Sequence, residues 1–147
     1  MARRASSAPP LTDAAGVAAA LKSALQRDLD VRSAWLFGSV AAGRARSDSD
    51  VDVGVWIDEP CKLDRLIELT GALRDRTGLP VEVVLLERAT PPLVRTATNG
   101  IPLLTRNERA EIEWVLEKWR DAEDWDQFLF SFLAERKRSR EASGPCA

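Results

Sequence analysis

Two aspartates are the residues whose type and spacing point most directly to chemistry. The stretch 50–57, DVDVGVWI, alternates at the period of a β-strand, so Asp50 and Asp52 share one face with their roots roughly 7 Å apart. Like charges on one face repel unless a cation lies between them. Mg²⁺ is typically held by one or two carboxylates together with substrate phosphates. The pair predicts a metal site; the alternative is a solvent-facing strand, where Asp is uncommon.

A glycine–serine pair precedes these aspartates, with ten residues between Ser39 and Asp50. Gly38 lets a backbone approach a phosphate closely, and a short helix from Ser39 would direct N–H groups and the hydroxyl at the anion. Gly43 is the expected end of that turn. An ordinary strand-ending turn explains the glycine but not the spacing. The chain contains neither a complete P-loop nor G-x-G-x-x-G.

Together these residues resemble the signature of the minimal members of the DNA polymerase β-like nucleotidyltransferase superfamily. Its usual form is GS-x-A-x-G-x-A-x-x-x-SD-x-D followed by an apolar residue. Nine positions within 16 residues match, namely Gly38, Ser39, Ala41, Gly43, Ala45, Ser49, Asp50, Asp52 and Val53. The resemblance implies an α/β fold of the polymerase β-like nucleotidyltransferase type, a small mixed sheet backed by helices, here with a C-terminal helical extension.

Three further charged residues are candidates for the site. Glu82 stands alone in the otherwise apolar strand 81–86, where a buried carboxylate needs a partner or a metal. In the resembled family an acid on this strand, usually Asp, is a metal ligand or general base. Arg44 and Arg46 could donate bidentate hydrogen bonds to phosphate, or belong to a solvated loop. Many relatives carry Arg at the position of Ala42, so this phosphate contact differs here.

Length and composition exclude several classes of protein. A chain of 147 residues is one domain of common size, and its net charge of −2 gives no basic field for nucleic acid. No signal peptide or transmembrane span is expected. Cys61 and Cys146 form no disulfide framework, which favours a cytoplasmic protein. The absence of histidine excludes a Ser-His-Asp triad and histidine-bound metals.

The elements that must position these residues follow from periodicity and caps. Strands are expected over 31–37, 51–57, 81–86 and 101–104. Helices are expected over 12–28, over 60–76 and over 91–99; Thr12 caps the first of them and Pro60 opens the second. A last helix is expected to begin at a capping box at 105–108. The acidic stretch 121–126 is expected to break the last helix. The predicted organisation is a disordered lead (1–10), a core (11–104), a helical extension (105–140) and a flexible tail (141–147).

Several side chains are expected to face the core. The residues predicted to point inward are Leu63, Leu66, Ile67 and Leu73 in one helix, and Ile112, Val115, Leu116 and Trp119 in the last. Trp35 and Trp56 are expected to be core residues rather than platforms for a base. The run FLFSFL at 128–133 either packs on the core or forms a protein interface.

For function, the resemblance implies a Mg²⁺-dependent enzyme that binds ATP. Its implied ligand sets are Asp50, Asp52 and Glu82 for the metal, and Gly38, Ser39, Arg44 and Arg46 for the nucleotide. Chains of this size resemble antitoxins that transfer AMP from ATP to a tyrosine of a HEPN-domain ribonuclease toxin. Since this chain has no tyrosine, the acceptor would lie on that partner, with 128–133 as the expected docking surface. The alternatives are an aminoglycoside-type enzyme, which normally carries a further substrate domain, and a binding-only antitoxin.

Overall fold

A four-stranded mixed sheet forms the centre of the computed structural model, which describes residues 8–57 and 63–142. Its strands are β1 (Val31–Phe37), β2 (Val51–Ile57), β3 (Val81–Leu85) and β4 (Ile101–Thr105), in the spatial order β3-β2-β1-β4. β1 pairs antiparallel with β2 and β4, whereas β3 runs parallel to β2. β3 and β4 are therefore the edges of the sheet.

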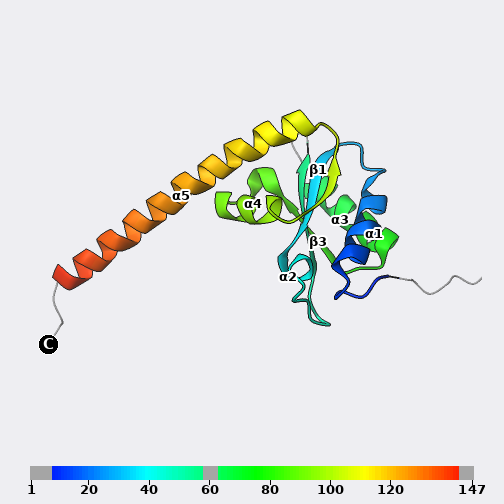
Figure 1. The fold of residues 1–147 in the computed structure, drawn as a ribbon, viewed down its shortest axis with the longest axis horizontal. Helices are drawn as coiled ribbons and strands as arrows, with labels where there is room; N and C mark the ends of the chain where they lie inside the picture. Colours follow the sequence, from blue (N-terminus) through cyan, green and yellow to red (C-terminus); the bar gives the residue numbers. More distant parts are fainter. Residues whose placement is uncertain (1–7, 58–62, 143–147) are drawn as a thin grey trace, which may run out of the picture.

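Helices cover both faces of this sheet (Figure 1). α1 (Ala14–Leu25) and α3 (Leu63–Thr77) lie on one face, and α4 (Pro91–Thr98) and the beginning of α5 (Glu108–Ala142) lie on the other. The short α2 (Gly38–Ala41) connects β1 to the loop before β2, and a 3-10 turn, η1 (Leu86–Arg88), follows β3. The predicted α/β fold with a mixed sheet and a C-terminal helical extension is confirmed.

The alternation predicted for β2 determines which side chains form the core. Val51, Val53 and Val55 are fully buried in the main cluster, which includes the buried stripes of α1 and α3. On the other face Trp35 and Trp56 stack on Trp114 of α5, with ring centroids 6.3 and 4.8 Å away. Both tryptophans are thus packing residues, as expected, and Trp56 also lies 4.3 Å from the Arg32 guanidinium.

A buried carboxylate fixes α3 against the start of the sheet. Asp28, which is 7% exposed, accepts hydrogen bonds from Arg65 Nη2 at 3.1 Å and Arg76 Nη1 at 2.8 Å. Arg65 also binds Asp30 through two 2.7 Å hydrogen bonds, and this contact lowers the pKa of the Asp30 carboxyl. Since α3 carries the chain from β2 to β3, this network helps to place β3 beside β2.

The structure corrects two predictions about α1 and α3 and leaves a third untested. Asp13, not Thr12, caps α1, because its Oδ1 accepts from Gly16 N at 3.0 Å. The predicted opening of the next helix at Pro60 lies outside the described residues. Leu63 and Ile67 of α3 are 66% and 60% exposed, so their inward assignment was wrong. The buried stripe of α3 consists of Leu69, Leu73 and Thr77, with Leu66 packed at its border.

The long helix α5 differs from its prediction at both its start and its middle. Asn107 caps it, accepting from Ala110 N at 3.0 Å, while Thr105 belongs to β4; the predicted capping box was wrong. No break occurs at 121–126, because Ala122 is fully buried within that stretch and Asp126 forms an ion pair with Arg95 at 2.6 Å. The acidic side chains around Ala122 are exposed and do not interrupt the helix.

The face of α5 that meets the body also differs from the prediction. Trp114 and Val115 pack against a second buried cluster, which contains Trp35, Leu86 and Val94. In contrast, Ile112 and Leu116 are 49% and 58% exposed, and Trp119 is 37% exposed. Trp119 is nevertheless anchored, since its Nε1 donates to Thr98 Oγ1 at 2.7 Å.

The second half of α5 projects away from the body (Figure 1). Every residue from Glu123 to Leu133 is exposed, so the run 128–133 does not pack on the core. At 1.5 Å per residue, residues 127–142 extend for about 24 Å. No helix within the described ranges combines the length and the apolar character needed to cross a bilayer.

Candidate active site

Two segments of the predicted motif meet where β1 ends and β2 begins. The antiparallel register places Phe37 opposite Asp52, so the following residue, Gly38, reaches the Asp52 carboxylate. Gly38 has φ +80°, and a Cβ built on it would lie only 2.1 Å from Asp52 Oδ2. A residue with a side chain could occupy this position only by displacing that carboxylate. The glycine of the phosphate turn and one predicted metal ligand are thus in direct contact.

The loop after Gly38 folds back on itself and forms one wall of a groove. Ala42 N donates to Gly38 O at 3.1 Å, and Arg44 N donates to Ser39 O at 2.8 Å. The turn ends at Gly43, with φ +74°, as predicted. This closure places Gly38, Ser39 and Arg44 on the lining of an open groove of about 630 Å³, a size typical of small-molecule sites.

The opposite wall of this groove was not predicted. It comes from the end of α4 and the turn to β4, and includes Thr96, Asn99 and Gly100. These residues follow Ser39 by more than fifty positions and approach it only because β4 pairs with β1. No pattern in the sequence marked them.

Arg46 differs from Arg44 in its surroundings. It is exposed, its backbone N–H donates to Ser49 Oγ at 2.7 Å, and it does not line the groove. The structure therefore associates only one of the two candidate arginines with the glycine–serine turn.

Two of the three candidate carboxylates lie on neighbouring strands, and the third lies just before one of them. Asp50 immediately precedes β2, and the parallel register places Asp52 of β2 beside Glu82 of β3. Burial, and then the charges of Glu82 and Asp50, raise the pKa of the Asp52 carboxyl above its usual value. The expectation that Glu82 is buried was wrong, because its side chain is exposed at the edge strand. Its proximity to Asp52, rather than its burial, makes it a candidate.

The carboxylates of this site supply only some of the ligands that a divalent cation needs. Across residues 8–57 and 63–142, no group of three or more Cys, Asp or Glu side chains converges closely enough to hold an ion. However, the mutually repelling carboxylates lie next to a groove that carries Ser39 and Arg44, and they are hard oxygen ligands. Mg²⁺ needs only one or two such ligands when phosphates complete its coordination. Asp50 and Asp52 fit such a shared site, whereas a preformed three-carboxylate site is not present.

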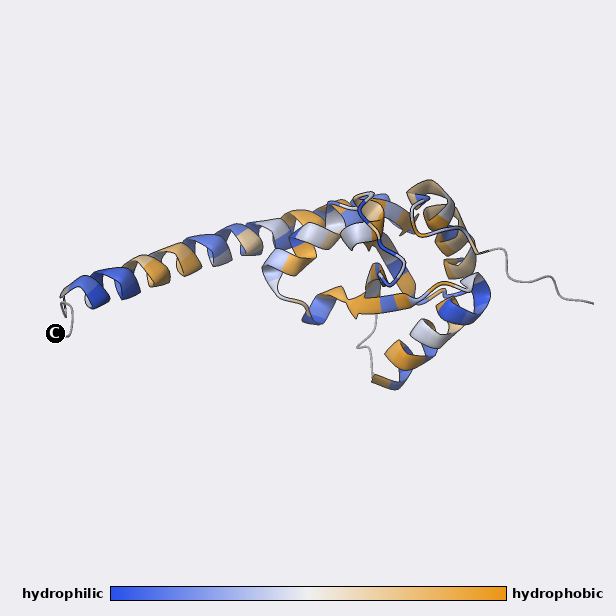
Figure 2. Ribbon diagram, turned by 90° about the horizontal axis from the view of Figure 1, so that it is seen from below, coloured by the Kyte–Doolittle hydropathy of each residue, from blue (hydrophilic) through white to orange (hydrophobic). Residues whose placement is uncertain are grey.

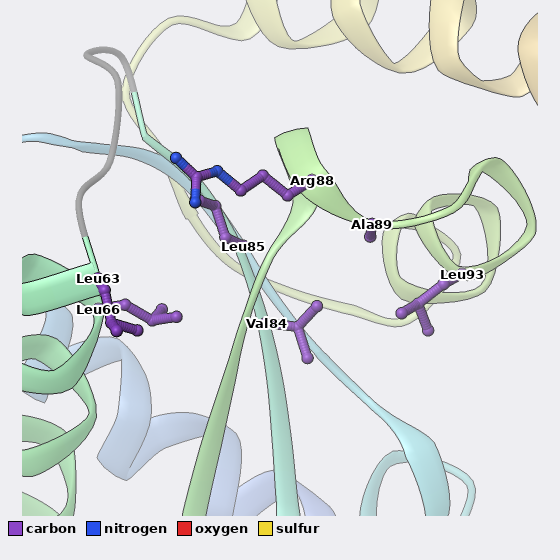
Figure 3. A pocket seen from close by; sticks show the side chains of 7 residues that line it. All are labelled: Leu63, Leu66, Val84, Leu85, Arg88, Ala89 and Leu93. Carbon is purple, nitrogen blue, oxygen red and sulfur yellow. The ribbon is translucent and has the colours of Figure 1, made fainter.

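A second, smaller hollow of about 220 Å³ lies along β3 (Figure 3). Figure 3 shows Leu63 and Leu66 on one side of the strand and Val84 and Leu93 on the other. Among the described residues that line it, Arg88 is the only charged one. This apolar lining is unsuited to a triphosphate, so the groove beside Ser39 is the better candidate for the nucleotide.

The contact between Gly38 and Asp52 leads to a testable expectation. Gly38→Ala should displace the Asp52 carboxylate and lower the rate of the expected nucleotidyl transfer by about 10²-fold, the usual cost of misplacing a reacting group by about 1 Å. Gly43→Ala is the matched control, because Gly43 has a similar φ of +74° but no atom within 4 Å of the added Cβ. Both variants should lose about 1–2 kcal/mol of stability through backbone strain. Equal activities would show that the contact with Asp52 is unimportant.

Comparisons with known proteins show which family this chain resembles in sequence and fold. Residues 19–109 match the family model described as polymerase beta, nucleotidyltransferase. The chain is 33% identical, over 91 residues, to the protein adenylyltransferase MntA of Thermococcus cleftensis. The aligned region covers 62% of this chain and 92% of that relative.

Solved structures give the same picture of the fold. A protein assigned as a minimal nucleotidyltransferase is 31% identical, with a TM-score of 0.52 over 66% of this chain and 99% of its own. A chain from a toxin–antitoxin crystal structure with AMP-PNP superposes with a TM-score of 0.58, covering 87% of this chain and 98% of its own. The latter is 18% identical, so that likeness concerns the fold alone.

Proposed function

This chain belongs to the polymerase beta nucleotidyltransferase family, and from that premise we propose that it is an antitoxin that transfers AMP from ATP to a tyrosine of a HEPN-type ribonuclease toxin. It is a nucleotidyltransferase enzyme. The proposed donor is ATP, the proposed acceptor is the phenol of the toxin, and the proposed compartment is the cytoplasm. Neither nucleic acid nor membrane is a proposed partner.

The observation that carries this proposal is the contact between the phosphate turn and the carboxylates. Gly38 joins a groove that is lined by Ser39 and Arg44 to Asp52, and Asp52 lies beside Glu82 in the sheet. A nucleotide whose phosphates lie along Ser39 and Arg44 would have its α-phosphate directed at the carboxylates. The identity of 33% to an adenylyltransferase supports AMP as the transferred group.

The residues of this chain would share the work of binding and orientation. Ser39 and the Arg44 guanidinium would donate hydrogen bonds to the phosphates, with Arg46 as a more distant positive charge. Asp50 and Asp52 would hold the divalent metal ion with which nucleotidyltransferases of this family act, here proposed to be Mg²⁺. When bound, that ion neutralises phosphate charge and polarises the α-phosphate.

Glu82 would act on the acceptor. Its carboxylate is exposed at the edge of the sheet, where a hydroxyl of another molecule can reach it. The acceptor oxygen bonds to the α-phosphorus, the bond from that phosphorus to the bridging oxygen of the β-phosphate breaks, and pyrophosphate leaves with the electron pair. Glu82 would take the acceptor proton, or serve instead as a further metal ligand.

Labelling of the toxin tests this proposal directly. Incubation with ATP labelled on the α-phosphate, Mg²⁺ and the proposed HEPN-type partner should place label on one tyrosine of that partner and suppress its ribonuclease activity. The matched toxin variant with that tyrosine changed to phenylalanine should stay unlabelled and active.

Two results would favour the other functions. Label on an aminoglycoside, with none on the toxin, would identify a small-molecule enzyme. Suppression of the ribonuclease without any label would identify an antitoxin that acts by binding alone.

A further inference from the structure

We propose that Asn99 binds the phosphates of the nucleotide beyond the α-phosphate, and so holds the pyrophosphate that leaves during transfer. Asn99 lies at the end of α4, across the groove from Ser39 and Arg44. The inference rests on the proposed function, because it adds a residue to the same nucleotide site. It concerns binding of the nucleotide, so it can be tested without the acceptor.

The groove and the carboxylates hold different parts of the nucleotide. Gly38 lines the groove and contacts Asp52, whereas Asp50, Asp52 and Glu82 do not belong to the described lining of the groove. A nucleotide with its α-phosphate at the carboxylates therefore extends into the groove with one of its two ends. That end is either the β- and γ-phosphates or the nucleoside.

The charge of the groove favours the phosphate end. Arg44 is the only charged residue of the described lining, and it forms no ion pair with any residue of 8–57 or 63–142. A guanidinium without a carboxylate partner is a strong donor to phosphate oxygens. Stacking of a base needs an exposed ring, and Phe37, the one ring that the described lining contains, is 7% exposed. The groove thus suits the β- and γ-phosphates.

Asn99 is the residue of the opposite wall whose side chain is free to donate. An asparagine amide has two N–H bonds, and that of Asn99 is exposed and forms no hydrogen bond with the described part of the chain. Thr96 of the same wall differs, because its hydroxyl already donates to Pro92 O at 3.0 Å. Arg44 and Asn99 therefore supply donors from the two walls of one groove.

The two neighbours of Asn99 hold it in place. Gly100 lies so close to β1 that a Cβ there would be 2.2 Å from Leu36 O. Thr98 Oγ1 accepts a hydrogen bond from Trp119 Nε1 at 2.7 Å. This bond ties the end of α4 to the first half of α5, which lies alongside α4 before the helix projects toward the C-terminus (Figure 2). The backbone at Asn99 is thus fixed before a nucleotide binds, which lowers the entropic cost of the contact.

Competition binding with Asn99→Ala tests this assignment. A fluorescent ATP analogue would be displaced by ATP, by pyrophosphate or by AMP, each in the presence of Mg²⁺. Asn99→Ala should weaken the binding of ATP and of pyrophosphate by about tenfold or more, the usual loss for one hydrogen bond to a charged group. AMP has neither a β- nor a γ-phosphate, so its affinity should equal that for the wild type.

Two further variants complete the experiment. Asn99→Asp keeps the size of the side chain but replaces its donors with a negative charge, so ATP and pyrophosphate should bind about 10²-fold more weakly. Gln26→Ala is the matched control. Gln26 is an exposed amide at the C-cap of α1, as Asn99 is at the C-cap of α4, and it does not line the groove. Its replacement should change none of the three affinities.

Other results would overturn the inference. Unchanged binding of ATP and pyrophosphate by Asn99→Ala would remove Asn99 from the site and leave the proposed function intact. An equal loss of affinity for AMP would show that Asn99 only shapes the groove. A changed preference between ATP and GTP, with pyrophosphate binding unaffected, would place Asn99 against the base. A wild-type chain that binds neither ATP nor pyrophosphate would overturn the proposed function, and this inference with it.

Discussion

Replacing Asp50 and Asp52 together with asparagine is expected to abolish AMP transfer while the fold remains intact. Asparagine keeps the shape of each side chain but removes the charges that would hold a cation against the nucleotide. We expect the transfer rate to fall by 10³-fold or more, since the neutralisation of phosphate charge would be lost. Calorimetry with ATP and Mg²⁺ should show a correspondingly weakened interaction.

The same substitutions should lower the transfer rate without lowering the free energy of unfolding. The pKa of the Asp52 carboxyl is raised in the folded protein by burial and by the charges of Glu82 and Asp50. A carboxyl of this kind binds its proton more tightly in the folded than in the unfolded state, so stability falls as pH rises through the interval between the two pKa values. At neutral pH the ionised Asp52 carboxylate lowers the free energy of unfolding, and Asp52→Asn removes this destabilisation. The melting temperature should therefore stay equal or rise.

Asp48→Asn is the control for this pair. Asp48 is an exposed acid of the same loop, and the loss of its charge should change neither ATP binding nor transfer. Tight binding of ATP with Mg²⁺ by the double variant, equal to that of the wild type, would contradict the assignment of Asp50 and Asp52.

The second large effect is expected at Glu82. If its carboxylate accepts the proton of the acceptor hydroxyl, Glu82→Gln should lower the transfer rate by about 10²- to 10⁴-fold, the usual contribution of a general base. The affinity for ATP with Mg²⁺ should stay the same, because the metal would be held by Asp50 and Asp52. Transfer rate and nucleotide affinity should be measured on the same preparation.

Glu82→Asp is the matched variant, since it keeps the charge on a chain one methylene shorter. Partial activity of this variant, together with an inactive Glu82→Gln, would support action through the carboxylate. A joint loss of affinity and rate in Glu82→Gln would make Glu82 a metal ligand. An unchanged rate would remove it from the site.

The strand–loop–strand segment could be predicted from the sequence because its constraints are local. The alternation in 51–57 determines which face of β2 carries Asp52, and the glycines of the loop have the positive φ angles that turns require. The parallel neighbour of Asp52 could be expected only through the resemblance, since pairing between β2 and β3 depends on where α3 places the chain.

The remaining features depend on contacts between distant segments. The groove wall at Thr96 and Asn99 exists because β4 pairs with β1, and the continuity of α5 depends on the burial of Ala122. The phase of α5 is set by the stacking of Trp114 on Trp56, a contact between residues nearly sixty positions apart. The periodicity of a helix indicates an apolar face, but several faces of α5 carry large apolar residues.

The position of β3 has a consequence for how activity fails on warming. The backbone of β3 pairs with β2 on one side only, Val81, Val83 and Leu85 are buried in the core, and Arg74 Nε donates to Val81 O at 2.8 Å. An edge strand of this kind opens by local fluctuations that cost less free energy than unfolding of the whole domain. Each opening removes Glu82 from Asp52, although β1 and β2 stay protected at the centre. Amide hydrogen exchange would then be faster in β3 than in β1 and β2, and on heating the activity would be lost before the whole domain unfolds.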